Sequence, residues 1–84
     1  MTEKEFQKDV IDLARQLGWE VYHCYNSRLV TSKGFPDLVL AHPIGRVVFA
    51  ELKTAKGRVS REQKRWIWML KKAGLDARVW RPSH

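Results

Sequence analysis

The sequence predicts an α/β domain in which two helices flank a mixed sheet of four short strands. Two segments repeat apolar residues at helical spacing, and short apolar runs bounded by turn residues lie around them. The run from Arg46 to Lys53 begins with apolar residues on both of its faces. A strand that is buried on both faces needs helices above and below the sheet. The expected element order is α-β-β-β-α-β.

The first helix is expected to begin after Thr2, which can cap it, with Glu5 as the second member of a capping box. Its apolar residues recur on one face: Phe6, Val10, Leu13 and Leu17. The second helix is expected to begin after Ser60, with Gln63 as its capping-box partner, and to end at Gly74.

Four segments are expected to form strands, because they are rich in apolar, aromatic and β-branched residues. They are residues 19–25, 37–40, 46–53 and 77–80. A polar loop at 26–34 separates the first two, and the turn Pro43-Ile44-Gly45 joins the second to the third.

Composition limits the class of protein. A chain of 84 residues that is 44% hydrophobic suits one domain, residues 1–84, and is too apolar for a disordered tail. No apolar run approaches the length of about 20 residues that crosses a bilayer, and the pattern of a signal peptide is not recognised in the first residues, so secretion is not expected. The lone Cys24 cannot form an internal disulfide. These features predict a cytoplasmic protein, and the net charge of +7 favours a polyanionic partner.

Two acidic residues are expected to meet at one end of the central hairpin. If His42 pairs with Arg46 across the turn, Asp37 lies opposite Glu51, with Cβ atoms about 5 Å apart. Lys53 shares the face of Glu51, because side chains alternate along a strand.

Two adjacent carboxylates repel each other unless a positive charge lies between them. Mg²⁺ or Mn²⁺ suits Asp37 and Glu51, and the carbonyl of Leu52 can supply a third oxygen. Lys53 can then orient or deprotonate an attacking water, which is the chemistry of phosphodiester hydrolysis. A lone Glu-x-Lys on a strand is more often a solvated face, so the prediction depends on the acid placed opposite it.

Three segments resemble the VRR-NUC branch of the PD-(D/E)XK nuclease superfamily: Gly34 to Leu40 (GFPDLVL), Phe49 to Thr54 (FAELKT) and Gly57 to Gln63 (GRVSREQ). The resemblance covers nearly the whole chain and implies a restriction-endonuclease-like core. It implies that Asp37, Glu51 and the Leu52 carbonyl hold the metal and that Lys53 is the catalytic lysine.

The resemblance also implies a glutamine near the active site, matched by Gln63, and a glutamate on the first helix. Glu3 fits the glutamate better than Glu5, which already has a capping role and points about 100° away from Phe6 around the helix. Glu5 stays the alternative, and Gln63 has the alternative of a purely capping role.

The whole charge surplus lies between Lys53 and Lys72, where eight basic residues accompany one acid. A solvated surface is the plain alternative to phosphate binding. The residues expected to contact nucleic acid there are Lys56, Arg58, Arg61, Lys64, Arg65 and Trp68. The loop at 26–34 adds Arg28 and Lys33, which are expected to approach the site from the opposite side.

These observations predict a Mg²⁺- or Mn²⁺-dependent, structure-selective DNA endonuclease, acting as a homodimer on branched DNA such as Holliday junctions. Neither a membrane nor a small organic cofactor is expected. The short chain resembles a stand-alone phage or mobile-element product. The alternative is a non-catalytic module with the same fold that binds nucleic acid or recruits a larger machine.

Overall fold

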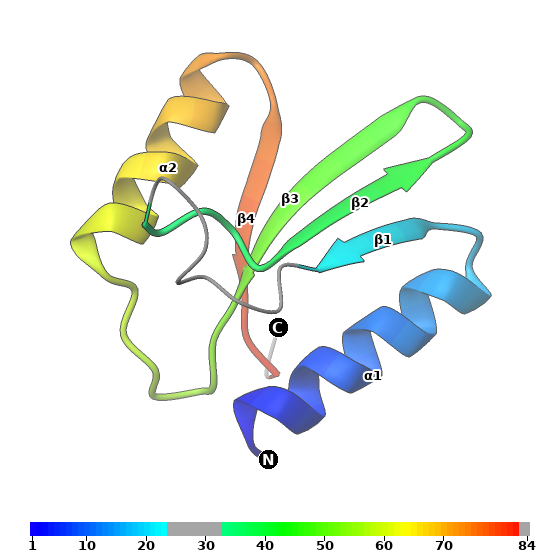
Figure 1. Ribbon diagram of the computed structural model, residues 1–84, viewed down its shortest axis with the longest axis horizontal. Coiled ribbons are helices and arrows are strands. Elements are labelled where there is room, and N and C mark those ends of the chain that lie inside the picture. The colour runs from blue at the N-terminus through cyan, green and yellow to red at the C-terminus, as the bar shows by residue number, and fades with distance from the viewer. Residues whose placement is uncertain (24–32, 83–84) are drawn as a thin grey trace.

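The computed structural model describes residues 1–23 and 33–82, and the predicted order α-β-β-β-α-β is confirmed there (Figure 1). The elements are α1 (Glu3–Gln16), β1 (Glu20–His23), β2 (Leu38–His42), β3 (Arg46–Leu52), α2 (Arg61–Lys72) and β4 (Asp76–Trp80). Within these ranges neither helix is long and apolar enough to cross a membrane.

The four strands form one mixed sheet in the order β1-β2-β3-β4. β2 pairs antiparallel with both β1 and β3, whereas β3 pairs parallel with β4. The α2 crossover makes this parallel pairing possible, because two parallel strands cannot be joined by a tight turn. The carboxyl ends of β3 and β4 therefore lie side by side.

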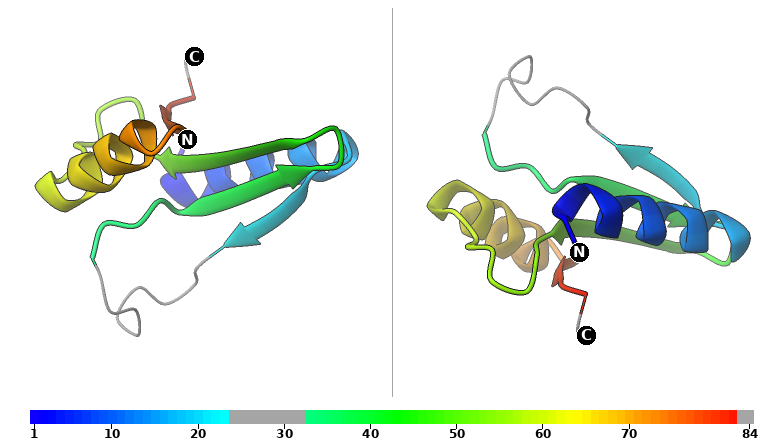
Figure 2. Two further views of the ribbon diagram at one scale, coloured as in Figure 1. Left: turned by 90° about the horizontal axis from the view of Figure 1, so that it is seen from above. Right: turned by 90° about the horizontal axis from the view of Figure 1, so that it is seen from below.

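The two helices pack on opposite faces of the sheet (Figure 2). On the α1 face, Phe6 and Ala14 pack with the even-numbered residues of β2 and β3, such as Leu38 and Ala50. On the other face, Ile67 and Leu70 of α2 pack against Ala77 of β4. The predicted three-layer arrangement is confirmed, and it gives each helix its own apolar cluster.

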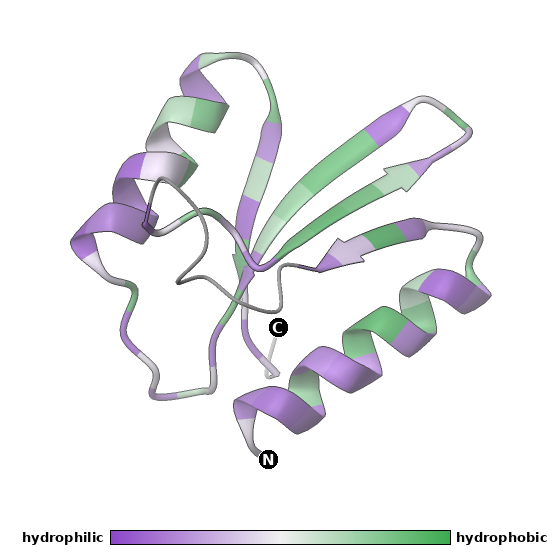
Figure 3. Cartoon of the chain, viewed as in Figure 1, coloured by the Kyte–Doolittle hydropathy of each residue, from purple (hydrophilic) through white to green (hydrophobic). Residues whose placement is uncertain are grey.

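Two details of the predicted burial are wrong. β3 is not covered on both faces along its length, because α2 packs mainly on β4 and leaves Val47 45% exposed. The apolar face of α1 ends early: Leu13 and Leu17 are 57% and 62% exposed, whereas Ala14 is buried. Hydropathy alternates around both helices, and hydrophilic residues dominate their outward faces (Figure 3).

The N-caps of both helices are confirmed. The Thr2 hydroxyl accepts the Glu5 N–H at 3.1 Å and donates to the Glu5 carboxylate at 3.0 Å. Glu5 therefore bonds the Thr2 hydroxyl in place of the backbone N–H that a full capping box uses. α2 has the complete box, in which Ser60 and Gln63 each accept the backbone N–H of the other at 3.1 and 2.8 Å.

Candidate active site

The β2–β3 hairpin has the predicted register. His42 pairs with Arg46, and the pairing continues to Leu38 and Ala50. Asp37 directly precedes Leu38, and its carboxylate accepts the backbone N–H of Leu52 at 3.0 Å. The turn thus sets which residues meet at the far end of the hairpin, where Asp37 approaches the end of β3.

Glu51 is an ionisable side chain inside the domain, with only 1% of its surface exposed. Its Oε2 accepts a hydrogen bond from Gln63 Nε2 at 2.9 Å and lies 3.6 Å from Lys53 Nζ. Its Oε1 is buried and has no hydrogen-bond partner among the described residues. A buried carboxylate oxygen without a partner destabilises the fold unless a cation or a donor reaches it.

Burial and the neighbouring Asp37 carboxylate raise the pKa of Glu51 to about 8. Both causes disfavour its charged form, and the nearby Lys53 ammonium only partly opposes them. The protein alone therefore holds Glu51 protonated near neutral pH. A cation placed between the acids would reverse this preference.

A third carboxylate completes the cluster. Ligand atoms of Glu3, Asp37 and Glu51 all lie within 4.8 Å of one another. Glu3 comes from the first residue of α1, whereas Glu5 faces the Thr2 cap. The structure therefore brings Glu3, and not Glu5, to the predicted acids.

Gln63 combines the two roles considered for it. Its Oε1 accepts the Ser60 N–H at 2.8 Å, so its amide nitrogen points away from the cap and donates to Glu51. Because the backbone donor fixes which end of the amide faces the cap, Gln63 can approach Glu51 only as a donor. The start of α2 is thereby joined directly to the buried acid.

Gly34 sets the path of the segment that leads to Asp37. Its φ is +87°, and a Cβ at this position would lie 2.5 Å from the Glu62 carbonyl carbon and 2.7 Å from the Gln63 nitrogen. Only glycine permits both the left-handed conformation and this close approach to α2. The glycine that carries part of the family resemblance therefore packs the Gly-Phe-Pro-Asp segment against the first turn of α2.

The acid cluster fits a hard divalent cation. It offers three carboxylates, one of them with an unpartnered buried oxygen, and oxygen ligands are those that Mg²⁺ prefers. The backbone contact of Leu52 within the site is made by its N–H. Metal binding by the Leu52 carbonyl stays a prediction.

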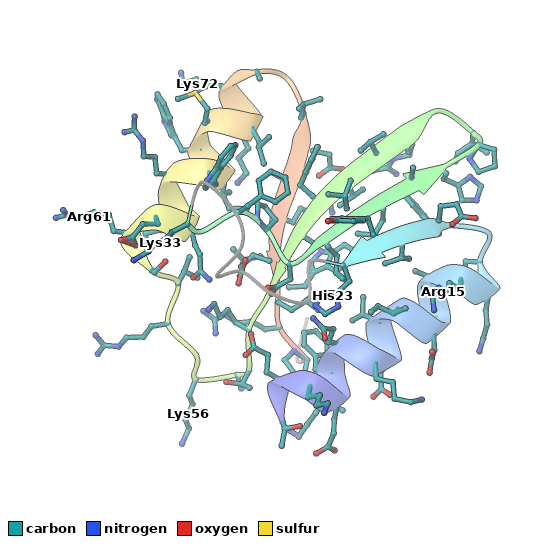
Figure 4. The ribbon with its side chains drawn as sticks, in the orientation of Figure 1. Arg15, His23, Lys33, Lys56, Arg61 and Lys72 are labelled. Atoms are coloured by element: carbon teal, nitrogen blue, oxygen red, sulfur yellow. The ribbon has the colours of Figure 1, made fainter. Side chains whose placement is uncertain are left out.

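The basic residues of the predicted nucleic-acid surface are exposed on α2 and on the loop before it. They are Lys56, Arg58, Arg61, Lys64 and Arg65. Lys56 lies at the far end of its loop, and Arg61 points away from the domain (Figure 4). None of the five forms an ion pair within residues 1–23 and 33–82. Their charges face solvent uncompensated.

Of the two loop predictions, the structure changes the one for Lys33 and does not test the one for Arg28. Lys33 lines a groove with Glu62, Arg65 and Trp66, so it lies beside α2 and not on the opposite side of the site (Figure 4). The reason is the close packing of the adjacent Gly34 on α2. Arg28, like Cys24, lies outside the described residues.

Trp68 is 55% exposed on α2, as a base-stacking residue would be. Its ring already has a cationic neighbour, because Lys72 Nζ lies 5.9 Å from the ring centroid. The other three tryptophans pack against the core: Trp19 and Trp80 against the α1 cluster, and Trp66 against the α2 cluster.

Arg81 is a residue at this end of the sheet that the sequence patterns do not indicate. Its Nη1 donates to the carbonyls of Thr54 and Gly57, both at 2.7 Å. Residues 24 and 27 positions apart in the chain meet because β3 and β4 are parallel and end together. The Arg81 contact could have been predicted from the sequence only if the parallel pairing of β3 with β4 had been predicted first.

The α/β core gathers three acids and a lysine at the end of its central hairpin, which is the arrangement that the resemblance to PD-(D/E)XK nucleases implies. The sequence matches the VRR-NUC domain family over residues 29–83. The chain belongs to the VRR-NUC family, which gives it a nuclease-like role.

Solved structures support this assignment. One VRR-NUC domain superposes with a TM-score of 0.80 at 26% identity, covering 92% of this chain and 81% of its own. A second VRR-NUC domain protein has a TM-score of 0.77 at 25% identity, with coverages of 96% and 78%.

Hjc, a Holliday junction resolvase from the archaeal hyperthermophile Archaeoglobus fulgidus, shares the fold, with a TM-score of 0.66 at 16% identity. The superposition covers 95% of this chain and 68% of Hjc. No protein with curated annotation matches the sequence.

Proposed function

We propose that the protein is a divalent-metal-dependent DNA endonuclease that is selective for branched DNA. The observation that carries this proposal is the cluster of Glu3, Asp37 and Glu51 with Lys53 beside it. A purely binding module gains nothing from three adjacent acids, because they repel both one another and the phosphate backbone.

In this proposal Glu3, Asp37 and Glu51 hold Mg²⁺ or Mn²⁺, together with the Leu52 carbonyl. The bound ion would neutralise the carboxylates, polarise the scissile phosphate and make water more acidic. Gln63 holds the Glu51 carboxylate in place through its amide donor. Lys53, whose side chain is only 16% exposed, orients the attacking water and offsets the negative charge that develops on phosphorus.

The basic surface supplies binding to the DNA backbone. Cations of α2 and of the preceding loop lie on the side of the sheet from which Gln63 reaches Glu51. Their contacts with phosphates would favour DNA of any sequence and release bound counterions. Selectivity for branched DNA would then come from the shape of the surface and from pairing of two protomers.

The decisive test is cleavage of four-way junction and linear duplex DNA by wild type and by Asp37→Asn, with Mg²⁺, Mn²⁺ or a chelator. We expect metal-dependent cuts by wild type, faster on the junction, and none by Asp37→Asn. Equal behaviour of the two proteins would refute the nuclease proposal. Metal-independent binding without cleavage would favour the non-catalytic module.

Homodimerisation is the second part of the proposal. An apolar groove of about 470 Å³ lies between α1 and the sheet, lined among others by Leu13, Leu17 and Trp80. Neighbouring exposed leucines of this kind often mark an interaction surface. Sedimentation velocity should show a dimer that Leu13→Ser/Leu17→Ser converts to monomer. Paired symmetric cuts across a junction should be lost in the same variant.

A further inference from the structure

We propose that Arg81 is a positioning residue: it fixes the Thr54–Gly57 turn against the end of β4 and thereby holds Lys56 and Arg58 where they meet the DNA backbone. This inference rests on the proposed nuclease function and extends it to a residue beyond the acid cluster.

The contacts of Arg81 are directed at one turn of the backbone. Nη1 lies 2.7 Å from both the Thr54 and Gly57 carbonyl oxygens and 3.5 Å from that of Ala55. The Thr54 carbonyl also accepts the Gly57 N–H at 3.2 Å, which closes the turn. An Nη group carries two hydrogens, so the two short contacts use it fully. Arg81 therefore ties together the first and last residues of the turn.

The turn begins directly after the proposed catalytic lysine. The Lys53 N–H donates to the Trp80 carbonyl at 3.0 Å, which extends the parallel β3–β4 pairing by one residue. Arg81 follows Trp80, so the two segments remain joined beyond the sheet by a side chain. In the described part of the chain, backbone pairing of these two segments ends at Lys53, and the Arg81 side chain continues the link beyond it.

The loop has little else to hold it. Ala55, Lys56 and Arg58 are exposed, so the loop buries little apolar surface that would order it. Among the described residues, Lys56 and Arg58 also have no acidic partner that would hold them. A segment of this kind opens easily unless its backbone is bonded elsewhere. Arg81 provides these bonds by donating to the Thr54 and Gly57 carbonyls. Because the carbonyls are neutral, the positive charge of Arg81 is not cancelled.

The first measurement is amide hydrogen exchange of Arg81→Ala, Arg81→Lys and a control, Arg78→Ala. Arg78 is exposed on β4 and, among the residues that the structure describes, pairs with Asp76 alone, so its removal changes the net charge equally without touching the turn. We expect exchange at residues 54–58 to rise about tenfold in Arg81→Ala, because bonds to a charged donor are strong. Exchange in α1 and in the sheet should stay unchanged, and Arg78→Ala should behave as wild type.

The second measurement is a double-mutant cycle on the Kd for duplex DNA, in an Asp37→Asn background that prevents cleavage. We expect Lys56→Ala to weaken binding about threefold when Arg81 is present and to have almost no effect in Arg81→Ala. With Arg78→Ala the two effects should multiply. A merely structural role of Arg81 would scale all Kd values without this coupling.

Each outcome decides the inference. Unchanged loop exchange in Arg81→Ala, or independent effects of Arg81→Ala and Lys56→Ala, would overturn it. Restored DNA affinity in Arg81→Lys with the loop still exchanging fast would also overturn it, because charge alone would then suffice. If Arg81→Ala does not fold, Arg81→Gln replaces it in both measurements. If wild type binds DNA but never cleaves it, the nuclease proposal fails. Amide hydrogen exchange and the double-mutant cycle still test the role of Arg81 in that case, because neither measurement needs cleavage.

Discussion

The two helices both begin beside the acid cluster, yet they bring different chemistry to it. α1 supplies a carboxylate, Glu3, from its first residue, and α2 supplies a neutral amide, Gln63, from its first turn. α1 carries four acidic and three basic side chains, whereas α2 carries one acidic and five basic ones. Helix N-termini favour negative charge, so both help to offset the repulsion among the carboxylates.

This difference separates two tasks that a DNA nuclease must combine. A metal site needs concentrated negative charge, and a DNA-binding surface needs positive charge. In the proposed function, the start of α1 and the hairpin end perform the first task, and the exposed face of α2 performs the second. Gln63 joins the two regions without adding charge of either sign. Four changes test this division of labour.

The largest effect is expected for Glu3→Gln, which removes the α1 contribution. Cleavage should fall about 100-fold, equivalent to about 2.7 kcal/mol of transition-state stabilisation, while DNA affinity stays the same or rises slightly. Glu5→Gln is the matched control, because it changes the same charge two residues away in the cap. Single-turnover rates measure both. An equal loss in the two variants would contradict a specific role for Glu3.

Gly34→Ala should disturb the placement of α2. Gly34 and Gly45 both have positive φ, but an added Cβ meets the α2 backbone only at Gly34 and meets nothing within 4 Å at Gly45. We expect Gly34→Ala to lower the free energy of unfolding by about 2 kcal/mol more than Gly45→Ala. Urea denaturation gives the difference. Equal destabilisation would show that strain at φ, and not contact with α2, explains the glycine.

The third test concerns Glu51, which both helices face. Its pKa is raised from about 4.5 to about 8, so the folded protein keeps a proton that the unfolded chain releases between these values. This stabilisation is complete below pH 4.5 and is lost as pH rises through 8. Without metal, the free energy of unfolding should therefore decline over this window. Glu51→Gln should flatten the decline and be more stable than wild type at pH 8, by about 1.5 kcal/mol.

Chemical denaturation at pH 5 and pH 8, with and without Mg²⁺, measures this effect. Mg²⁺ should stabilise wild type at pH 8 far more than it stabilises Glu51→Gln. A wild-type stability that rises from pH 5 to pH 8 in the absence of metal, with no difference in Glu51→Gln, would contradict the assigned environment of Glu51.

The smallest effect is expected on the basic surface of α2. Arg65→Ala should weaken DNA binding about threefold and reduce the dependence of log Kd on log salt by about 1, with little change in the cleavage rate of bound DNA. Arg15→Ala removes an exposed arginine near the end of α1 and should change neither quantity. Titrations at several salt concentrations distinguish the helices. Equal effects would mean that net charge, not location, governs binding.

Much of the site follows from local sequence rules. Pro43-Ile44-Gly45 and the pairing of His42 with Arg46 determine that Asp37 reaches the end of β3. Strand alternation brings Lys53 to Glu51, and the Ser60 capping box gives the start of α2. Glu3 was favoured over Glu5 as the glutamate near Asp37 and Glu51, because Glu5 already has a capping role, and the structure agrees.

What the sequence by itself determined, then, is the order of elements, the hairpin register and the residue types at its end, because each depends on neighbours within a few positions or across one tight turn. Only the tertiary structure decided that Glu51 is buried, that Lys33 lies beside α2, that Leu13 and Leu17 stay exposed and that Arg81 bonds the Thr54–Gly57 turn. These features depend on how α1 crosses the sheet and on the parallel pairing of β3 with β4. Local periodicity does not specify either, since both arise from packing between residues distant in the chain.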